Sequence, residues 1–209
     1  SFMDDIYYLS EVHCDAITEL LNIGMGQAAG SLSEMVNAEV KLSIPSLELL
    51  SRLDAIQRLN DPPCTRITAI KQHFEGPFWG DALLLFPQEK SLELVRILMK
   101  DEVPLDMLTE LEQDALTEVA NIILNCCLSS LANILSHEVT SELPIFITGS
   151  ALDVLDGCFT QDQDVVMFLR MDFALQTKDI NGYVAFILEM PAIECFKVSV
   201  NHYLGLITD

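Results

Sequence analysis

Two groups of polar residues in this sequence share the same residue types at the same helical spacing and are candidates for chemistry. Each group holds two acids and one amide: Asp15, Glu19 and Asn22 in the first, Asp114, Glu118 and Asn121 in the second. Residues at i, i+4 and i+7 lie on one stripe of an α-helix, at about 0°, 40° and −20°. A carboxylate can pair with a cation, and an amide offers a donor and an acceptor to a bound water. One such group alone is typical of a solvated helix face, so the case for chemistry depends on the duplication.

The duplication belongs to an internal repeat. At an offset of 99 residues, segments 15–45 and 114–144 are identical at 11 of 31 positions without a gap, whereas unrelated segments would share about two. The acids and the amide recur in register, while neighbouring apolar positions differ, as Gly24 and Ile123 do. Asparagine is a poor residue for the middle of a helix because its side chain competes for backbone hydrogen bonds. Its recurrence at one position favours a use for the amide.

Two long matching helices are needed to position these residues. Apolar residues recur at spacings of three and four over residues 11–36 and about 107–136, which predicts an amphipathic helix in each half. Thr109 and Glu112 fit a capping box at the start of the second helix. Further elements are expected as strands at 64–75, 78–86, 164–174 and 180–190, closing helices at 88–100 and 192–204, and a short connecting helix at 50–60.

The repeat predicts one α/β (α+β) domain over residues 1–209, built from two repeats at about 11–100 and 107–209. We expect pseudo-twofold symmetry, with the two long helices packed on one face of a mainly antiparallel sheet and about three strands per half. Pro45 and Pro144 should lie at a strand end or a sheet edge, because proline cannot donate to a ladder.

The charge balance is strongly acidic. The 209 residues include 11 Lys plus Arg against 32 Asp plus Glu, a formal net charge of −21, and no Lys or Arg occurs between Lys100 and Arg170. Nucleic acids and anionic membranes are bound through clustered Lys and Arg, so both are excluded as partners. A partner of the segment 101–169 should be basic or should bring a cation.

A cytoplasmic protein without membrane insertion is predicted. The N-terminus carries acid where a signal peptide has a basic region, and the richest apolar segment, residues 119–135, is interrupted by Asn and Ser. The six cysteines form no CxxC pair and are interpreted as buried free thiols. Gly24, Gly26 and Gly30 lie inside a predicted helix with no Lys-Ser/Thr after them, so they favour close helix packing over a nucleotide loop. The His and Cys spacings match no zinc site, and no metal site is predicted.

The full pattern, Asp-x3-Glu-x2-Asn-x22-Pro, resembles the motif of the CheC/CheX/FliY chemotaxis phosphatases, in which each motif marks one active site. Here the pattern occurs twice, ending at Pro45 and at Pro144. Residues 22–35 are also similar to the first helix of CheC proteins, and residues 180–191 to their C-terminal strand. Two motifs favour CheC over CheX, which carries one per chain. Ala120 departs from the glycine that often precedes the second asparagine, and we do not expect this to disable the site.

The resemblance implies a phosphatase that hydrolyses the aspartyl phosphate of the chemotaxis response regulator CheY. Asn22 and Asn121 are then the catalytic amides that orient the attacking water. Glu19 and Glu118 are the catalytic carboxylates that pair with the lysine of the receiver domain.

The same resemblance implies the partners. Asp15 and Asp114 are assigned to helix-face support or partner contact. The protein needs no cofactor of its own, since Mg²⁺ is expected in the phosphorylated regulator. The deamidase CheD is a further candidate partner, and a monomer is expected. The alternative is a non-catalytic interaction module of the flagellar-switch or CheD-binding type, against which the acids and amides in both halves argue.

Overall fold

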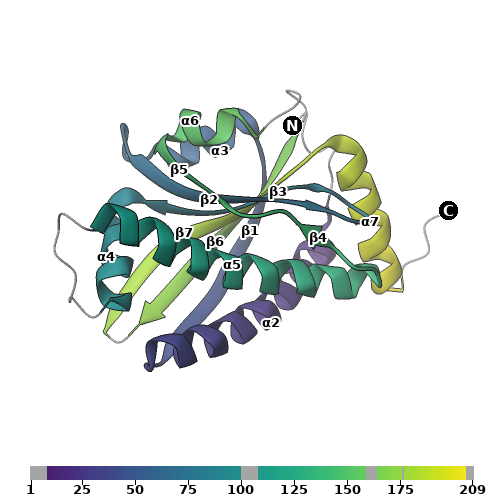
Figure 1. Ribbon diagram of the computed structural model, residues 1–209. Helices are drawn as coiled ribbons and strands as arrows, with labels where there is room; N and C mark the ends of the chain where they lie inside the picture. Colours follow the sequence, from purple (N-terminus) through teal and green to yellow (C-terminus); the bar gives the residue numbers. More distant parts are fainter. Residues whose placement is uncertain (1–8, 100–107, 159–163, 176, 206–209) are drawn as a thin grey trace.

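The computed structural model describes residues 9–99, 108–158, 164–175 and 177–205 (Figure 1). Its elements in chain order are α2 (Glu11–Val36), β1 (Val40–Ser51), α3 (Arg52–Leu59), β2 (Arg66–Glu75), β3 (Gly80–Pro87), α4 (Gln88–Leu98), α5 (Leu108–Leu135), β4 (Thr140–Ser141), β5 (Ile145–Ser150), α6 (Ala151–Asp156), β6 (Val165–Leu175), β7 (Lys178–Leu188) and α7 (Met190–Tyr203). The predicted mixed α/β class is confirmed, and both long helices are present at nearly the expected bounds.

The first long helix, α2, begins with a capping box. The Ser10 hydroxyl accepts a hydrogen bond from the His13 N–H at 3.3 Å, and His13 Nδ1 accepts one from the Ser10 N–H at 3.0 Å. Both bonds satisfy backbone donors that have no partner within the helix. The helix ends at Asn37, whose φ of 52° is the left-handed conformation of a C-terminal cap. Its buried face follows the expected spacing through Ile17, Leu21, Met25, Ala28 and Leu32.

The start of the second long helix differs from the prediction. Thr109 lies inside α5, which the structure describes from Leu108 onward. The Glu112 carboxyl is buried, and its Oε1 accepts a hydrogen bond at 3.1 Å from the Ser91 hydroxyl of α4. The predicted capping box is wrong in placing Thr109 at the N-cap, since α5 is already helical at Leu108, and Glu112 links α5 to α4.

One antiparallel sheet carries all the described strands. Its order is β1-β6-β7-β3-β2-β4, and β5 also pairs with β2. The two hairpins β2–β3 and β6–β7 lie side by side through the central β3–β7 pair. The antiparallel sheet that the sequence predicts is confirmed, with a very short strand, β4, in addition to the three expected in the second half.

One strand of each half pairs with the hairpin of the other half. β1 adds to β6 in the second half, and β5 adds to β2 in the first half. Each hairpin thus has its outer neighbour from the other half, which gives the sheet its pseudo-twofold pattern. α6 begins at Ala151, 99 residues after the start of α3 at Arg52, so the sequence offset held information about a helix that was not predicted.

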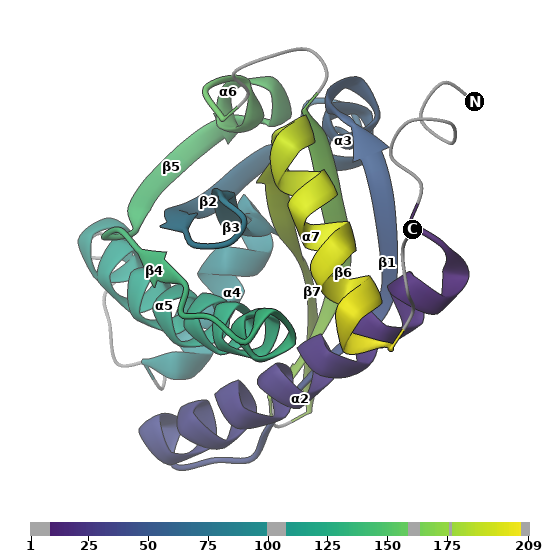
Figure 2. The same cartoon turned by 90° about the vertical axis from the view of Figure 1, so that its right-hand side faces the viewer.

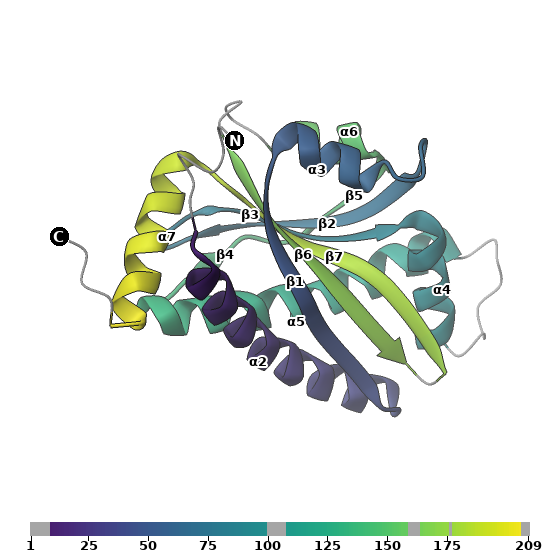
Figure 3. The ribbon, with the colours of Figure 1, turned by 180° about the vertical axis from the view of Figure 1, so that it is seen from behind.

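The helices form a layer on each face of the sheet (Figures 1, 2 and 3). The long helices α2 and α5 lie side by side on one face together with α4 and α7, and they enclose the larger hydrophobic core. The short helices α3 and α6 cover part of the other face over a second core that includes Leu59, Leu85, Val154 and Phe168.

The close approach of the long helices depends on one glycine. A Cβ atom on Gly24 would lie 2.5 Å from Ser130 Oγ and 2.8 Å from the Cys126 carbonyl oxygen of α5, whereas Cβ atoms on Gly26 and Gly30 would meet nothing within 4 Å. The predicted role in helix packing therefore holds for Gly24 alone of the three.

Part of α5, Glu110–Asn133, is long and apolar enough to cross a membrane by length and composition, and half of its most apolar window is buried. Leu116, Val119 and Ile123 lie in the core, while Glu118 and Asn121 are exposed. This division into two faces is typical of a core helix in a folded domain.

Candidate active site

The six predicted residues occupy the outer faces of the two long helices. Asp15 and Glu19 are exposed on α2, and Asn22 is half-buried. Asp114, Glu118 and Asn121 are all exposed on α5. Among the described residues, no hydrogen bond or ion pair joins the two groups. Each is therefore a separate candidate site on its own helix.

The Asn22 amide bonds to the backbone of β1 through both of its polar atoms. Its Nδ2 donates to the Ile44 carbonyl oxygen at 3.0 Å, and its Oδ1 accepts from the Ile44 N–H at 2.8 Å. The pairing of β1 with β6 shifts register between Ser43 and Ser46, so the backbone at Ile44 and Pro45 is bulged and needs other partners. Asn22 supplies them. In the first half, the spacing from asparagine to proline therefore has a structural explanation: the amide fastens helix to strand.

Asn121 has different surroundings from its counterpart. Its Oδ1 accepts a hydrogen bond from Asn125 Nδ2 at 3.0 Å, and in the described chain its own Nδ2 has no protein partner. Leu143, which corresponds to Ile44, is 88% exposed. The amide of Asn121 therefore faces solvent with free donor and acceptor capacity, beside the exposed carboxylate of Glu118.

A buried glutamine lies behind Asn125. Gln72 of β2 is 3% exposed, and its Nε2 lies 3.1 Å from Ser141 Oγ, 3.0 Å from the Glu142 carbonyl oxygen and 3.5 Å from Asn125 Oδ1. Sequence reasoning missed both Gln72 and Asn125. The repeat gives a weak indication of both residues, because each is a polar amide where the other half has a different kind of residue. Met171 corresponds to Gln72, and Gly26 corresponds to Asn125.

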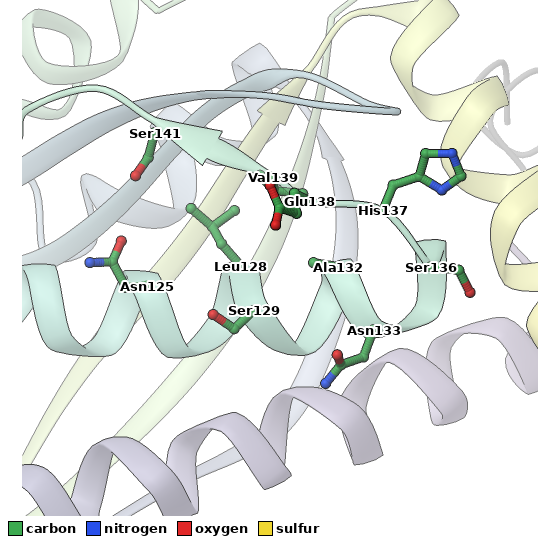
Figure 4. Close-up of a pocket in the computed structure, with 10 residues that line it drawn as sticks. All are labelled: Asn125, Leu128, Ser129, Ala132, Asn133, Ser136, His137, Glu138, Val139 and Ser141. Carbon is green, nitrogen blue, oxygen red and sulfur yellow. The ribbon is translucent and has the colours of Figure 1, made fainter.

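A cavity of about 650 Å³ continues from this point along the C-terminal half of α5 (Figure 4). Asn125 and Ser141 lie together at one end of it, and Ser136 and His137 lie at the other. Half of its ten lining residues carry a hydroxyl or amide side chain, and the others include His137 and Glu138. The exposed face of α5 is therefore polar well beyond the predicted residues.

Thiol and metal chemistry find little support in the structure. Among the described residues, no three His, Cys, Asp or Glu side chains gather closely enough to hold a metal ion. Burial raises the pKa of the Cys127 thiol and raises that of Cys158 to about 11, so neither is a reactive thiolate. Cys64 and Cys195 are exposed free thiols, which corrects the expectation that all six cysteines are buried.

Comparisons with known proteins bear on the exposed helix faces. Residues 12–49, which contain the first acid–amide group, match the model of the CheC-like family. The flagellar motor switch phosphatase FliY of Bacillus subtilis is 26% identical over 177 residues, covering 82% of this chain and 44% of FliY. The CheY-P phosphatase CheC of Bacillus subtilis is 23% identical over 139 residues, covering 65% of this chain and 66% of CheC. The chain thus spans less than two thirds of the length of either relative.

Solved structures share the fold. FliY of Thermotoga maritima superposes with a TM-score of 0.77 at 15% identity, covering 93% of this chain and 98% of that one. The FliM middle domain of Helicobacter pylori gives 0.66 at 9% identity, with coverages of 91% and 99%. CheX in the CheX–CheY–BeF3–Mg²⁺ complex of Borrelia burgdorferi gives 0.51 at 18% identity, with coverages of 80% and 97%. The resemblance predicted from the sequence is confirmed: the chain is similar to CheC-type chemotaxis proteins in sequence, and it shares the fold of these solved structures.

Proposed function

We propose that this chain is a phosphatase that hydrolyses the aspartyl phosphate of a CheY-like response regulator. One observation carries the proposal: α5 presents the Glu118 carboxylate and the free Asn121 amide together on an exposed stripe. Two relatives, FliY and CheC, are named as phosphatases, and a CheX of the same fold has been solved with CheY. The substrate class is taken from these relatives, and the residue roles from the geometry.

In the proposed hydrolysis, this protein mainly positions the attacking water and the receiver domain. Hydrolysis of an acyl phosphate needs a water held in line with the leaving oxygen. The Asn121 amide can accept a hydrogen bond from that water and donate another, because its Nδ2 is free. Glu118, one helical turn away, can pair with the lysine of the receiver domain and so fix its register. The regulator brings its own Mg²⁺, so this chain needs no cofactor. Asp114 extends the acidic stripe and supports docking.

The two candidate sites are unequal in this proposal. Asn22 uses one N–H and one lone pair on Ile44, and it is half-buried, so it has less capacity to hold a water. Asn121 is exposed and keeps both N–H groups of its Nδ2 free of protein partners in the described chain. We therefore assign most of the activity to Glu118 and Asn121, with Glu19, Asn22 and Asp15 as a second, less accessible site.

A second candidate function is a non-catalytic docking module. The likeness to the FliM middle domain favours it, because FliM has the same fold at 9% identity. Binding of CheD and a monomeric state remain predictions. Measuring the phosphatase activity with and without CheD would distinguish a regulated enzyme from an unregulated one.

The decisive experiment measures binding and turnover together. Purified protein is mixed with a phosphorylated CheY, and both complex formation and phosphate release are followed. The proposal expects phosphate release above the intrinsic rate of CheY, whereas a docking module would bind without accelerating it. Absence of acceleration at saturating protein would overturn the phosphatase proposal.

A further inference from the structure

We propose that Asn125 is a positioning residue for Asn121 and that the buried Gln72 holds Asn125 in turn. This inference rests on the proposed function, since it concerns the same site. The contact that carries it is the 3.0 Å hydrogen bond from Asn125 Nδ2 to Asn121 Oδ1, one turn along α5.

The bond fixes which way the catalytic amide faces. An exposed asparagine on a helix would otherwise sample several rotamers and both amide orientations. When Oδ1 of Asn121 accepts from Asn125, one of its lone pairs remains for water, and Nδ2 is left free on the other side. A water placed there meets an amide of defined orientation. Holding a reactant in one geometry can be worth a factor of 10² in rate.

Gln72 is the residue that can hold Asn125 in place. Its Nε2 is directed at three oxygens, Asn125 Oδ1, Ser141 Oγ and the Glu142 carbonyl. Its own Oε1 is buried and, within the described chain, has no partner. An unpaired buried acceptor costs about 1–3 kcal/mol, a cost that an apolar residue such as Met171 at the corresponding position avoids. The Nε2 donor of Gln72 is therefore the atom that makes its hydrogen bonds, and it contacts Asn125, Ser141 and the Glu142 carbonyl beside the site.

The part of the first half that the structure describes contains no equivalent arrangement. Gly26 stands where Asn125 would be, and the backbone of Ile44 orients Asn22 directly. The two asparagines of the repeat are thus positioned by different means, one by the backbone of β1 and the other by side chains on α5 and β2.

The test replaces Asn125 by leucine, which keeps its approximate size and adds no charge, and by glutamine, which keeps the donor. For hydrolysis of phosphorylated CheY we expect Asn125→Leu to lower kcat about tenfold or more with little change in KM, and Asn125→Gln to recover part of it. Gln72→Met should lower kcat less, since Gln72 acts at one remove. Gln57→Ala, an exposed change on α3 across the sheet, is the control and should change neither constant.

A second readout separates this inference from the proposed function. Side-chain NMR couplings of Asn121 should show one χ1 rotamer in the wild type and several in Asn125→Leu. If Asn121→Ala slows hydrolysis while Asn125→Leu leaves both kcat and the Asn121 rotamer unchanged, the positioning role is wrong. If the wild type proves inactive, the phosphatase proposal fails, and the rotamer measurement alone decides whether Asn125 orders Asn121.

Discussion

The two equivalent asparagines of the repeat, Asn22 and Asn121, make different contacts. Asn22 bonds to both polar groups of the Ile44 backbone, whereas Asn121 meets only the side chain of Asn125. The sequence shows the same acid–amide pattern in both halves, and the pattern itself does not distinguish the two amides. The difference arises from the path of the chain after each helix, which brings β1 against α2 but leaves residues 142–144 between the short β4 and β5.

The first prediction at this scale concerns the stability role of Asn22. Asn22→Ala leaves the bulged backbone of β1 without its two partners, so the free energy of unfolding should fall by about 1–3 kcal/mol. Urea unfolding followed by circular dichroism measures it. Gln27→Ala, an exposed change on the same helix, should stay within about 0.5 kcal/mol of the wild type. Equal stability of Asn22→Ala and wild type would show that the Ile44 contacts contribute nothing.

A second prediction follows from Glu112. Burial raises the pKa of its carboxyl, and the smaller effect of the Ser91 hydrogen bond opposes this. The folded state then holds the proton more tightly than the unfolded state, so stability from this group is present at low pH and is lost as pH rises through the raised pKa. Glu112→Gln stays neutral and should gain stability relative to wild type as the pH rises from about 4.3, the usual pKa of a glutamate, toward neutral.

Unfolding of both proteins across this pH range measures the difference directly. Glu110→Gln, an exposed change two residues earlier, serves as the control and should show no trend. A pH-independent difference between Glu112→Gln and wild type would mean that burial does not penalise the charged carboxylate.

At the scale of the elements, the contact between α2 and α5 makes Gly24 and Gly26 an informative pair. A methyl group at Gly24 collides with Ser130 and Cys126, while one at Gly26 meets open space. Gly24→Ala should therefore destabilise the protein by about 1–3 kcal/mol, although alanine is the better helix former. Gly26→Ala should stabilise it by about 0.5–1 kcal/mol. Thermal unfolding measures both, and a similar effect of the two changes would refute the close packing of the helices at Gly24.

The helices and strands were largely predictable because apolar periodicity and turn residues are patterns within short segments of sequence. Residues 11–36 were expected as a helix and form one, and the four core strands begin within two residues of their predicted starts. The second short helix at Ala151 was missed, although the 99-residue offset from α3 indicated it. The capping box at Thr109 failed because Glu112 found a buried partner on α4, and no local pattern contains that contact. The same holds for Asn22 with Ile44 and for Gln72 with Asn125: each pair joins residues far apart in sequence.

For the whole molecule, the exchange of β1 and β5 makes the two halves interdependent. Each hairpin takes its outer strand from the other half, so neither half completes its own sheet. We expect one cooperative unfolding transition. Fluorescence of the single tryptophan, Trp79, reports on the first half, and far-ultraviolet circular dichroism reports on both. The two probes should give the same urea midpoint, and separate midpoints would indicate that the halves unfold independently.

Four of the acidic residues can be assigned to the face of the molecule that carries the two asparagines. Of the 32 acidic residues in the sequence, Asp15, Glu19, Asp114 and Glu118 lie exposed on the two helices that carry the asparagines. A net charge of −21 suits a partner that brings a lysine and a metal ion. The fold displays these helices on one face and covers the other with α3 and α6, so the candidate docking surface is the long-helix face.

The most direct test of the central claim compares Asn121→Ala with Asn22→Ala as catalysts of phosphate release from phosphorylated CheY, with Gln113→Ala as an exposed control on α5. The wild type should accelerate release, Asn121→Ala should lose on the order of 10²-fold, and Asn22→Ala should keep most of the rate at temperatures where it remains folded. An Asn121→Ala protein that is folded and as fast as the wild type would contradict the assignment of the site.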